Sequence, residues 1–91
     1  MSNVIIKLKI MPAGVETDLK ALAKIVEQVI EKFEGMETRV TEEPIAFGLK
    51  AVIFTFLRDE KKGSTEPIEK EIEAMKDVNS AEVIDVRRAF G

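Results

Sequence analysis

The stretch Leu49–Leu57, LKAVIFTFL, is the most apolar part of the chain and decides its fold. β-branched and aromatic residues are concentrated in its middle, and both residue types favour strands. We therefore predict a central strand here. The stretch is apolar on both sides, because its alternating side chains divide into two apolar sets: Leu49, Ala51 and Ile53 on one side, and Val52, Phe54 and Phe56 on the other.

The residues before this stretch predict a strand, a helix and a second strand. Apolar and basic residues alternate over residues 6–10, which is typical of a strand with one buried face. Apolar residues then recur at three- and four-residue steps as far as Gly35, which predicts an amphipathic helix with Thr17 as its N-cap residue. The short, mostly polar segment Thr38–Thr41 predicts an edge strand.

The residues after the central stretch predict a second helix and a final strand. Ser64 or Thr65 can cap the helix, and its apolar stripe consists of Ile68, Ile72 and Met75. The segment Val78–Val86 reads as the last strand. The order is therefore βαββαβ. Right-handed crossovers place both helices on one face of a four-stranded antiparallel sheet, which is the ferredoxin-like sandwich of the α+β class. Other orders of the four strands stay possible.

The apolar residues on the second side of the central strand need a cover, because two helices cover only one face of a sheet. Cover by the loops and terminus of the chain itself is the favoured interpretation, since packing within one chain explains most apolar residues. A surface for a partner is the alternative.

The composition excludes several classes of function. The 17 acidic residues outnumber the 14 basic ones, and the formal net charge of −3 disfavours a binder held by phosphate neutralisation. Cysteine and histidine are absent, which excludes a disulfide framework, a thiol nucleophile, a zinc finger and an imidazole base. No apolar run is long enough to span a membrane. We expect a single cytoplasmic domain over residues 1–91, with no metal or other cofactor and no catalytic residue of its own.

Two segments are candidates for contact with a partner. In PIAFG, residues 44–48, the aromatic Phe47 lies in a connection between residues that restrict or bend the backbone. Phe47 either begins the central strand and points into the core, or it is a preorganised anchor for a pocket of a partner. Arg87 and Arg88 are adjacent guanidinium groups near the C-terminus. They are either a solvated strand end or a source of planar, bidentate contacts to phosphate or carboxylate groups.

The chain resembles one known family along its whole length. The similar stretches are KIMP at 9–12, ETDL at 16–19, EPIAFGL at 43–49 and VIDVRR at 83–88. They are similar to the archaeal translation elongation factor 1-beta family, which matches the C-terminal exchange domain of the eukaryotic factor. The resemblance implies a ferredoxin-like fold. It also implies a guanine nucleotide exchange factor that promotes GDP release from elongation factor 1-alpha without covalent chemistry.

The resemblance further implies which residues contact this GTPase. They are Pro44, Ile45, Phe47, Gly48, Arg87 and Arg88. Phe47 matches the aromatic that packs against the GTPase in the family, with Ala46 replacing a glycine before it. The eukaryotic factor directs a near-terminal lysine at the magnesium site of the GTPase, and here Phe90 and Gly91 occupy roughly that position. Because the two arginines are the cations nearest to the terminus, we expect them to contact acidic or phosphate groups of the GTPase.

Two other classes stay open on the residues alone. One is a ferredoxin-like small-molecule-sensing module, which typically assembles through its sheet edges. The other is an RNA- or ribosome-binding module, which stacks bases on the aromatics of a basic sheet; the acidic charge argues against it. We expect a monomer whose partner is elongation factor 1-alpha in its GDP-bound and nucleotide-free forms, with no direct contact with nucleic acid or membrane.

Overall fold

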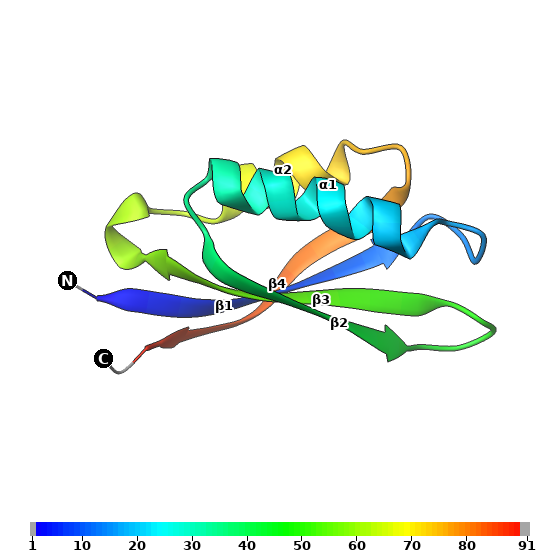
Figure 1. The fold of residues 1–91 in the computed structure, drawn as a ribbon, viewed down its shortest axis with the longest axis horizontal. Coiled ribbons are helices and arrows are strands. Elements are labelled where there is room, and N and C mark those ends of the chain that lie inside the picture. The colour runs from blue at the N-terminus through cyan, green and yellow to red at the C-terminus, as the bar shows by residue number, and fades with distance from the viewer. Residues whose placement is uncertain (1, 90–91) are drawn as a thin grey trace.

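The computed structural model describes residues 2–89 and has two layers, a four-stranded sheet and a pair of helices on one of its faces (Figure 1). The elements are, in chain order, β1 (Asn3–Pro12), α1 (Leu19–Lys32), β2 (Met36–Pro44), β3 (Lys50–Asp59), the 3₁₀ turn η1 (Glu60–Lys62), α2 (Glu66–Glu73) and β4 (Val78–Arg88). The predicted succession of strands and helices is confirmed.

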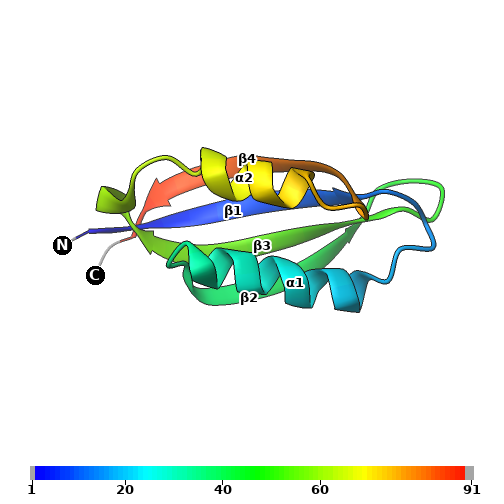
Figure 2. The ribbon, with the colours of Figure 1, turned by 90° about the horizontal axis from the view of Figure 1, so that it is seen from above.

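The strands lie in the order β2-β3-β1-β4, and every neighbouring pair is antiparallel. The interior of the sheet is therefore formed by β1 and β3, with Leu8 opposite Phe54. Each helix connects two strands that are separated by a third, and both helices cross the same face (Figure 2). This is the ferredoxin-like sandwich that the sequence predicts.

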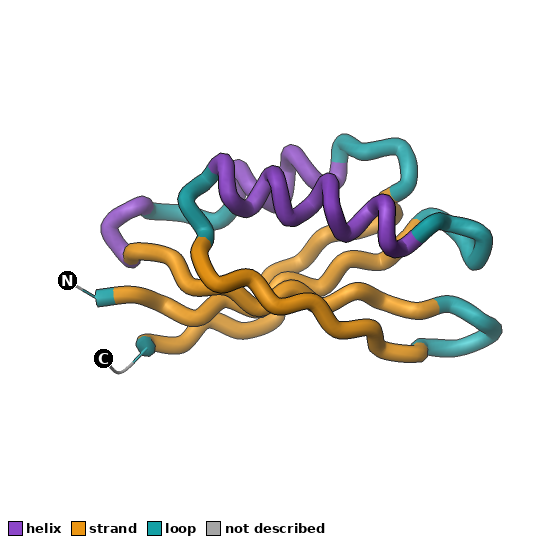
Figure 3. The backbone as a smooth tube through the Cα atoms, in the orientation of Figure 1, coloured by secondary structure: helices purple, strands orange, loops and turns teal. Residues whose placement is uncertain are grey.

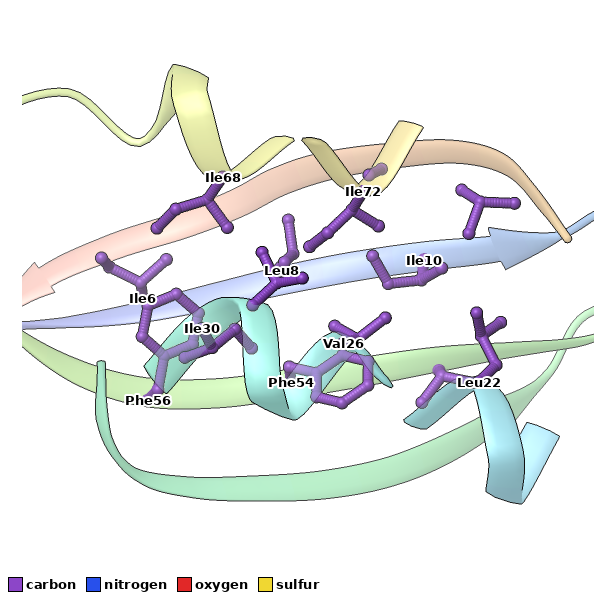
Figure 4. Packing of buried hydrophobic residues seen from close by; sticks show 14 residues of the cluster. Ile6, Leu8, Ile10, Leu22, Val26, Ile30, Phe54, Phe56, Ile68 and Ile72 are labelled. Carbon is purple, nitrogen blue, oxygen red and sulfur yellow. The ribbon is translucent and has the colours of Figure 1, made fainter. Parts of the chain in front are cut away.

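The core lies between the helices and the sheet (Figure 4). It is formed by alternate residues of β1 and β3 and by the apolar stripes of α1 and α2, which pack together between the two layers. The side chains that are almost entirely removed from solvent are Ile6, Leu8, Ile10, Val26, Ile30, Val52, Phe54, Phe56, Ile68 and Ile72. Burying one such side chain contributes about 1.5–3 kcal/mol to stability, so this layer holds β1 and β3 against the two helices.

The face of the sheet away from the helices was predicted to be covered by loops and the terminus of the chain. The described loops lie at the two ends of the sheet (Figure 3), so cover by loops is wrong for residues 2–89. Long side chains of the strands next to β3 lie over it instead, since Lys9 Nζ of β1 and Glu43 Oε2 of β2 are 3.9 Å apart across that strand. Ala51, opposite Glu43, is fully buried, while Ile53 stays partly exposed.

The start of α1 corrects the predicted cap by one residue. The N-cap residue is Asp18, whose Oδ1 accepts hydrogen bonds from the backbone N–H groups of Lys20 and Ala21 at 3.1 and 3.2 Å. The hydroxyl of Thr17 instead accepts a hydrogen bond from the N–H of Gly14 at 3.3 Å and so closes the preceding loop. Both residue types cap helices well, and only the path of the loop separates the two neighbouring positions.

The end of α1 also differs from the prediction. The helix ends at Lys32, and Glu34 adopts the left-handed conformation, with φ of 68°. Gly35 is needed for space, because a Cβ at this position would collide with Ile30 Cγ2 and lie 3.0 Å from a ring carbon of Phe56. The glycine lets the chain pass close over the core on its way into β2.

Both hydroxyls predicted at the start of α2 are used. Ser64 Oγ accepts a hydrogen bond from the N–H of Glu66 at 3.0 Å, while Thr65, the N-cap residue, donates from Oγ1 to Glu69 Oε1 at 3.0 Å.

The edge strands β2 and β4 are longer than the sequence predicts, and they reach Pro44 and Arg88. Their additional residues are mostly polar, and the hydrogen bonds to β3 and β1 hold them in extended conformation.

Candidate functional site

The connection between β2 and β3 is a tight turn with an unusual residue in it. The N–H of Leu49 donates to the carbonyl oxygen of Ala46 at 2.9 Å, and the central residues Phe47 and Gly48 have φ of 52° and 81°. Positive φ at both central positions is the pattern of the type I′ turn that joins twisted antiparallel strands. Asn-Gly or Asp-Gly is the usual pair in such a turn, and an aromatic residue is not.

The side chain of Phe47 points into solvent. It is 97% exposed, and β3 begins only at Lys50, so the interpretation that Phe47 begins the central strand and enters the core is wrong. The left-handed conformation costs a residue with a Cβ about 1–2 kcal/mol, and so large an exposure leaves almost no intramolecular contact to offset that cost. Strained backbone that carries an exposed apolar ring is typical of a contact site.

The neighbours of Phe47 in the predicted contact segment lie beside it. Pro44 is the exposed last residue of β2 and is opposite Lys50 in the register. The N–H of Ile45 donates to the carbonyl oxygen of Leu49 at 2.9 Å. The side chain of Ile45 is 43% exposed. The predicted contact residues of this segment are therefore gathered at one end of the sheet.

Arg87 and Arg88 are the last two residues of β4, where they pair with Ile5 and Val4 of β1. Both side chains are largely exposed, at 77% and 76%. Each is next to a carboxylate of the chain. Arg87 Nε is 3.0 Å from Asp85 Oδ2, and Arg88 Nη2 is 3.7 Å from Glu60 Oε2. The positions that the resemblance matches to a near-terminal lysine, 90 and 91, lie outside the described residues.

The two candidate segments lie at opposite ends of the sheet (Figure 1). Arg88 is opposite Val4 at the start of β1, whereas the β2–β3 turn lies beyond Pro12 at its end. These positions in β1 are eight residues apart, which corresponds to about 26 Å at the rise of a strand. The residues predicted to contact the GTPase are therefore divided between two areas of the surface, and no single pocket within residues 2–89 contains both.

Arg58 lies at the same end of the sheet as Arg88, since both are opposite Val4 of β1. Its role was not predicted from the sequence. Arg58 is only 5% exposed, and its guanidinium binds backbone carbonyl oxygens. Nε donates to Phe33 at 2.9 Å, and Nη1 and Nη2 donate to Gly63 at 3.1 Å, Ser64 at 3.4 Å and Lys62 at 3.5 Å. The side chain thus connects the loop after α1 with the end of η1 and the segment that follows it. The strand alternation that buries Phe54 and Phe56 also assigns Arg58 to the core side, and this signal was available.

The described residues also bear on three other kinds of site: a surface that stacks nucleic acid bases, a metal site and a membrane-spanning helix. Phe54 and Phe56 are buried under the helices, so they cannot stack nucleic acid bases as the aromatics of an RNA-recognition sheet do. Within residues 2–89, no group of three or more Asp, Glu, His or Cys side chains is arranged to hold a metal ion. No helix in this part of the chain has the length and apolar character needed to cross a membrane.

Comparison with solved structures supports the fold. The de novo designed protein Foldit4 superposes with a TM-score of 0.60 at 19% sequence identity, over 98% of this chain and 98% of that one. At this level of identity the similarity concerns the arrangement of helices and strands alone. A designed protein therefore shares the backbone, and the function must be read from the residues.

Comparison with protein families and curated proteins identifies the family. Residues 5–89 match the model of the EF-1 guanine nucleotide exchange domain. Over 88 residues the chain is 41% identical to elongation factor 1-beta of Methanosarcina barkeri, covering 97% of this chain and 99% of that protein. The corresponding protein of Methanosphaera stadtmanae is 43% identical over 88 residues, covering 97% and 98%. The chain therefore belongs to the elongation factor 1-beta family, and its function is guanine nucleotide exchange in translation elongation.

Proposed function

We propose that the chain binds elongation factor 1-alpha and promotes the release of GDP from it, so that GTP can enter. One observation carries the choice of contact site. Phe47, which matches the aromatic of the family that packs against the GTPase, is 97% exposed on a backbone of unfavourable conformation. Because the backbone of the turn is already fixed by its hydrogen bond, enclosing the ring in a pocket of the partner requires no further ordering of that backbone.

Nucleotide exchange of this kind shifts a conformational equilibrium of the GTPase. The factor accelerates exchange if it binds the nucleotide-free form more tightly than the GDP-bound form. By linkage, bound factor then weakens the affinity for GDP by the same ratio. GDP leaves intact and no covalent bond is made or broken, so the chain needs no nucleophile and no general base.

The separation of the two contact areas gives this preference a physical basis. A stiff sheet that contacts the GTPase at places more than about 26 Å apart favours one relative arrangement of the parts that it contacts. The ring of Phe47 anchors one part. Arg87 and Arg88 offer planar guanidinium groups to carboxylate or phosphate groups of the other. Their own ion pairs are exposed and contribute at most about 1 kcal/mol each, so these pairs are easily exchanged for groups of the GTPase.

Residues 1–91 act as one domain and as a monomer in the cytoplasm, with no cofactor of their own. Any magnesium at the joint surface belongs to the GTPase and its nucleotide. The GDP-bound and the nucleotide-free forms of the GTPase are both bound, the second more tightly.

The release of labelled GDP from elongation factor 1-alpha tests this function. The GTPase is loaded with labelled GDP, unlabelled GTP is added in excess, and the chain is supplied at about one tenth of the GTPase concentration. Because the factor is released after each exchange, we expect it to discharge several GTPase molecules per molecule of chain. Release that is no faster than without the chain contradicts the function. A stimulation that needs equimolar chain indicates simple binding instead of catalysed exchange.

A further inference from the structure

Three segments of the chain meet at the end of the sheet that carries Arg88 (Figures 1 and 2). They are the start of β1, the turn η1 after β3 and the end of β4. Backbone hydrogen bonds join them: the N–H of Glu60 donates to the carbonyl oxygen of Ser2 at 3.2 Å, and the N–H of Ala89 donates to that of Asn3 at 2.9 Å. The start of β1 therefore holds η1 on one side and the end of β4 on the other.

The two arginines of β4 lie on opposite faces of the sheet. Arg88 is opposite Val4 of β1, and Arg58 of β3 is opposite the same residue. Arg87 is opposite Ile5. Directly opposite residues of antiparallel strands share a face, and successive residues of a strand alternate between the faces. Arg58 and Arg88 therefore lie on the helix side, where Val4 packs against the core, and Arg87 lies on the other side.

Glu60 connects Arg58 with Arg88. The guanidinium of Arg58 donates to the carbonyl oxygens of Gly63 at 3.1 Å and Lys62 at 3.5 Å, and so fixes the end of the turn that Glu60 begins. From this turn the carboxylate of Glu60 reaches Arg88, with Oε2 3.7 Å from Nη2. This distance is too long for a hydrogen bond, so the carboxylate attracts the guanidinium without using its N–H donors.

We infer that Arg58 is a positioning residue for nucleotide exchange: through η1 and Glu60 it holds the side chain of Arg88 in the orientation that contacts the GTPase. The inference rests on the proposed function. A long side chain that is ordered before binding loses less conformational entropy in the complex, and having to order it on binding weakens the affinity about twofold to tenfold. Arg87 is on the other face and pairs with Asp85 of its own strand, so this arrangement acts on Arg88 and not on Arg87.

Double-mutant cycles distinguish positioning from a general loss of structure. Arg58→Lys keeps the positive charge but lacks the planar set of donors. The dissociation constant for nucleotide-free elongation factor 1-alpha is measured by titration calorimetry, at a temperature where circular dichroism shows every variant folded. We expect Arg58→Lys to weaken binding about threefold in the unchanged chain and in Arg87→Ala, and to have no further effect in Arg88→Ala. An equal loss in both arginine backgrounds means that the substitution only disturbs the fold, and the inference is then wrong.

Glu60→Gln tests the connection without removing any donor of Arg58. Glutamine has almost the shape of glutamate but no charge to attract Arg88, so we expect binding to weaken about twofold to threefold. Glu73→Gln is the control, because it makes the same change at an exposed position of α2, and it should bind as the unchanged chain does. Unchanged binding of Glu60→Gln overturns the inference. Tighter binding also overturns it, because the carboxylate would then compete with the GTPase for Arg88.

The order of the Arg88 side chain is also measured in the free chain. Nitrogen-15 relaxation of the arginine Nε–H groups reports how far each side chain is ordered. We expect the order parameter of Arg88 Nε to fall in Arg58→Lys and in Glu60→Gln, while that of Arg87 stays unchanged. If Arg88 is as mobile in the unchanged chain as in Glu60→Gln, nothing positions it and the inference is wrong, although the proposed function stands. A chain that orders Arg88 but does not accelerate GDP release contradicts the proposed function and, with it, the inference.

Discussion

Phe47 has a positive φ of 52°, at a turn position where asparagine or aspartate is usual. The ring contributes almost nothing to the fold, because it is 97% exposed. We therefore expect Phe47→Ala to leave the melting temperature nearly unchanged while it weakens binding to the GTPase by a factor of ten or more, as loss of an aromatic anchor does. A large fall in melting temperature measured by circular dichroism would show that the ring is structural.

A second substitution at this position separates strain from contact. Phe47→Asn creates the Asn-Gly pair that type I′ turns prefer. We expect the free energy of unfolding in urea to rise by about 0.5–1 kcal/mol, since asparagine tolerates the left-handed conformation at φ of 52°. Stimulation of GDP release should fall as it does for alanine. An unfolding free energy below that of Phe47→Ala contradicts the assignment of strain to this residue.

Arg58 is the residue on which the opposite end of the molecule depends. Its guanidinium satisfies carbonyl oxygens of two separate segments, and no lysine or apolar side chain offers this planar set of donors. We expect Arg58→Met to lower the free energy of unfolding by about 2–4 kcal/mol, because several partly buried acceptors lose their donors. Urea denaturation measures this loss. The exposed Arg39→Met is the control and should cost less than about 0.5 kcal/mol.

At the scale of elements, the start of α1 offers a matched pair of neighbouring substitutions. Asp18→Ala removes the acceptor of two backbone N–H groups, and we expect it to cost about 1 kcal/mol of unfolding free energy. Thr17→Ala removes one longer hydrogen bond in the loop and should cost less. Thermal unfolding of both variants checks the order. A larger loss of unfolding free energy for Thr17→Ala than for Asp18→Ala would contradict the assignment of Asp18 as the N-cap residue.

Helix α1 is also tied to its neighbour at the other end. Lys32 Nζ lies 2.7 and 2.8 Å from the two carboxylate oxygens of Glu71 on α2. Both side chains are exposed, so the pair contributes at most about 1 kcal/mol and weakens with salt. The buried stripes of the two helices, and not this pair, hold the helical layer on the sheet.

At the scale of the whole molecule, the distance between the two contact areas predicts independent effects. The longest dimension of the chain is 42 Å, and the β2–β3 turn and the end of β4 lie toward its opposite ends (Figure 1). Because distant sites without shared partners contribute additively, we expect the binding free-energy losses of Phe47→Ala and of Arg87→Ala/Arg88→Ala to sum in the triple variant. A double-mutant cycle on the dissociation constant measures the coupling. A coupling above about 0.5 kcal/mol contradicts two separate contacts.

The dependence of GDP release on salt distinguishes the contributions of the two proposed contacts. Charged groups at an interface govern the dependence of association on ionic strength. We expect stimulation of GDP release by Arg87→Ala/Arg88→Ala to be reduced and to depend less on salt, whereas Phe47→Ala keeps the original dependence. Exchange assays between 50 mM and 500 mM potassium chloride check this. Full stimulation by the double arginine variant would remove these residues from the mechanism.

Much of the fold was predictable because it follows from local patterns. The alternation in β1 and β3 and the helical spacing in α1 and α2 assign each side chain to a face, and the ferredoxin-like topology follows from the order of the elements. The predictions failed where a residue's role depends on distant parts of the chain. Thr17 and Asp18 are equally good caps until the loop that contains Gly14 is placed. Gly35 looks like a helix end, but the side chains of Ile30 and Phe56 are what exclude a Cβ there.

The contact residues show the same division. The sequence by itself determined the family and the type of fold, and it predicted the segments for contact with a partner, because these follow from residue types and their spacing. Only the tertiary structure decided that Phe47 lies in solvent, that Arg58 and Arg88 lie on either side of Val4, and that the two arginines of β4 are at the far end of the sheet. Spacing along a strand fixes the face on which a side chain lies, but the pairing of strands from distant parts of the chain fixes which residues become neighbours.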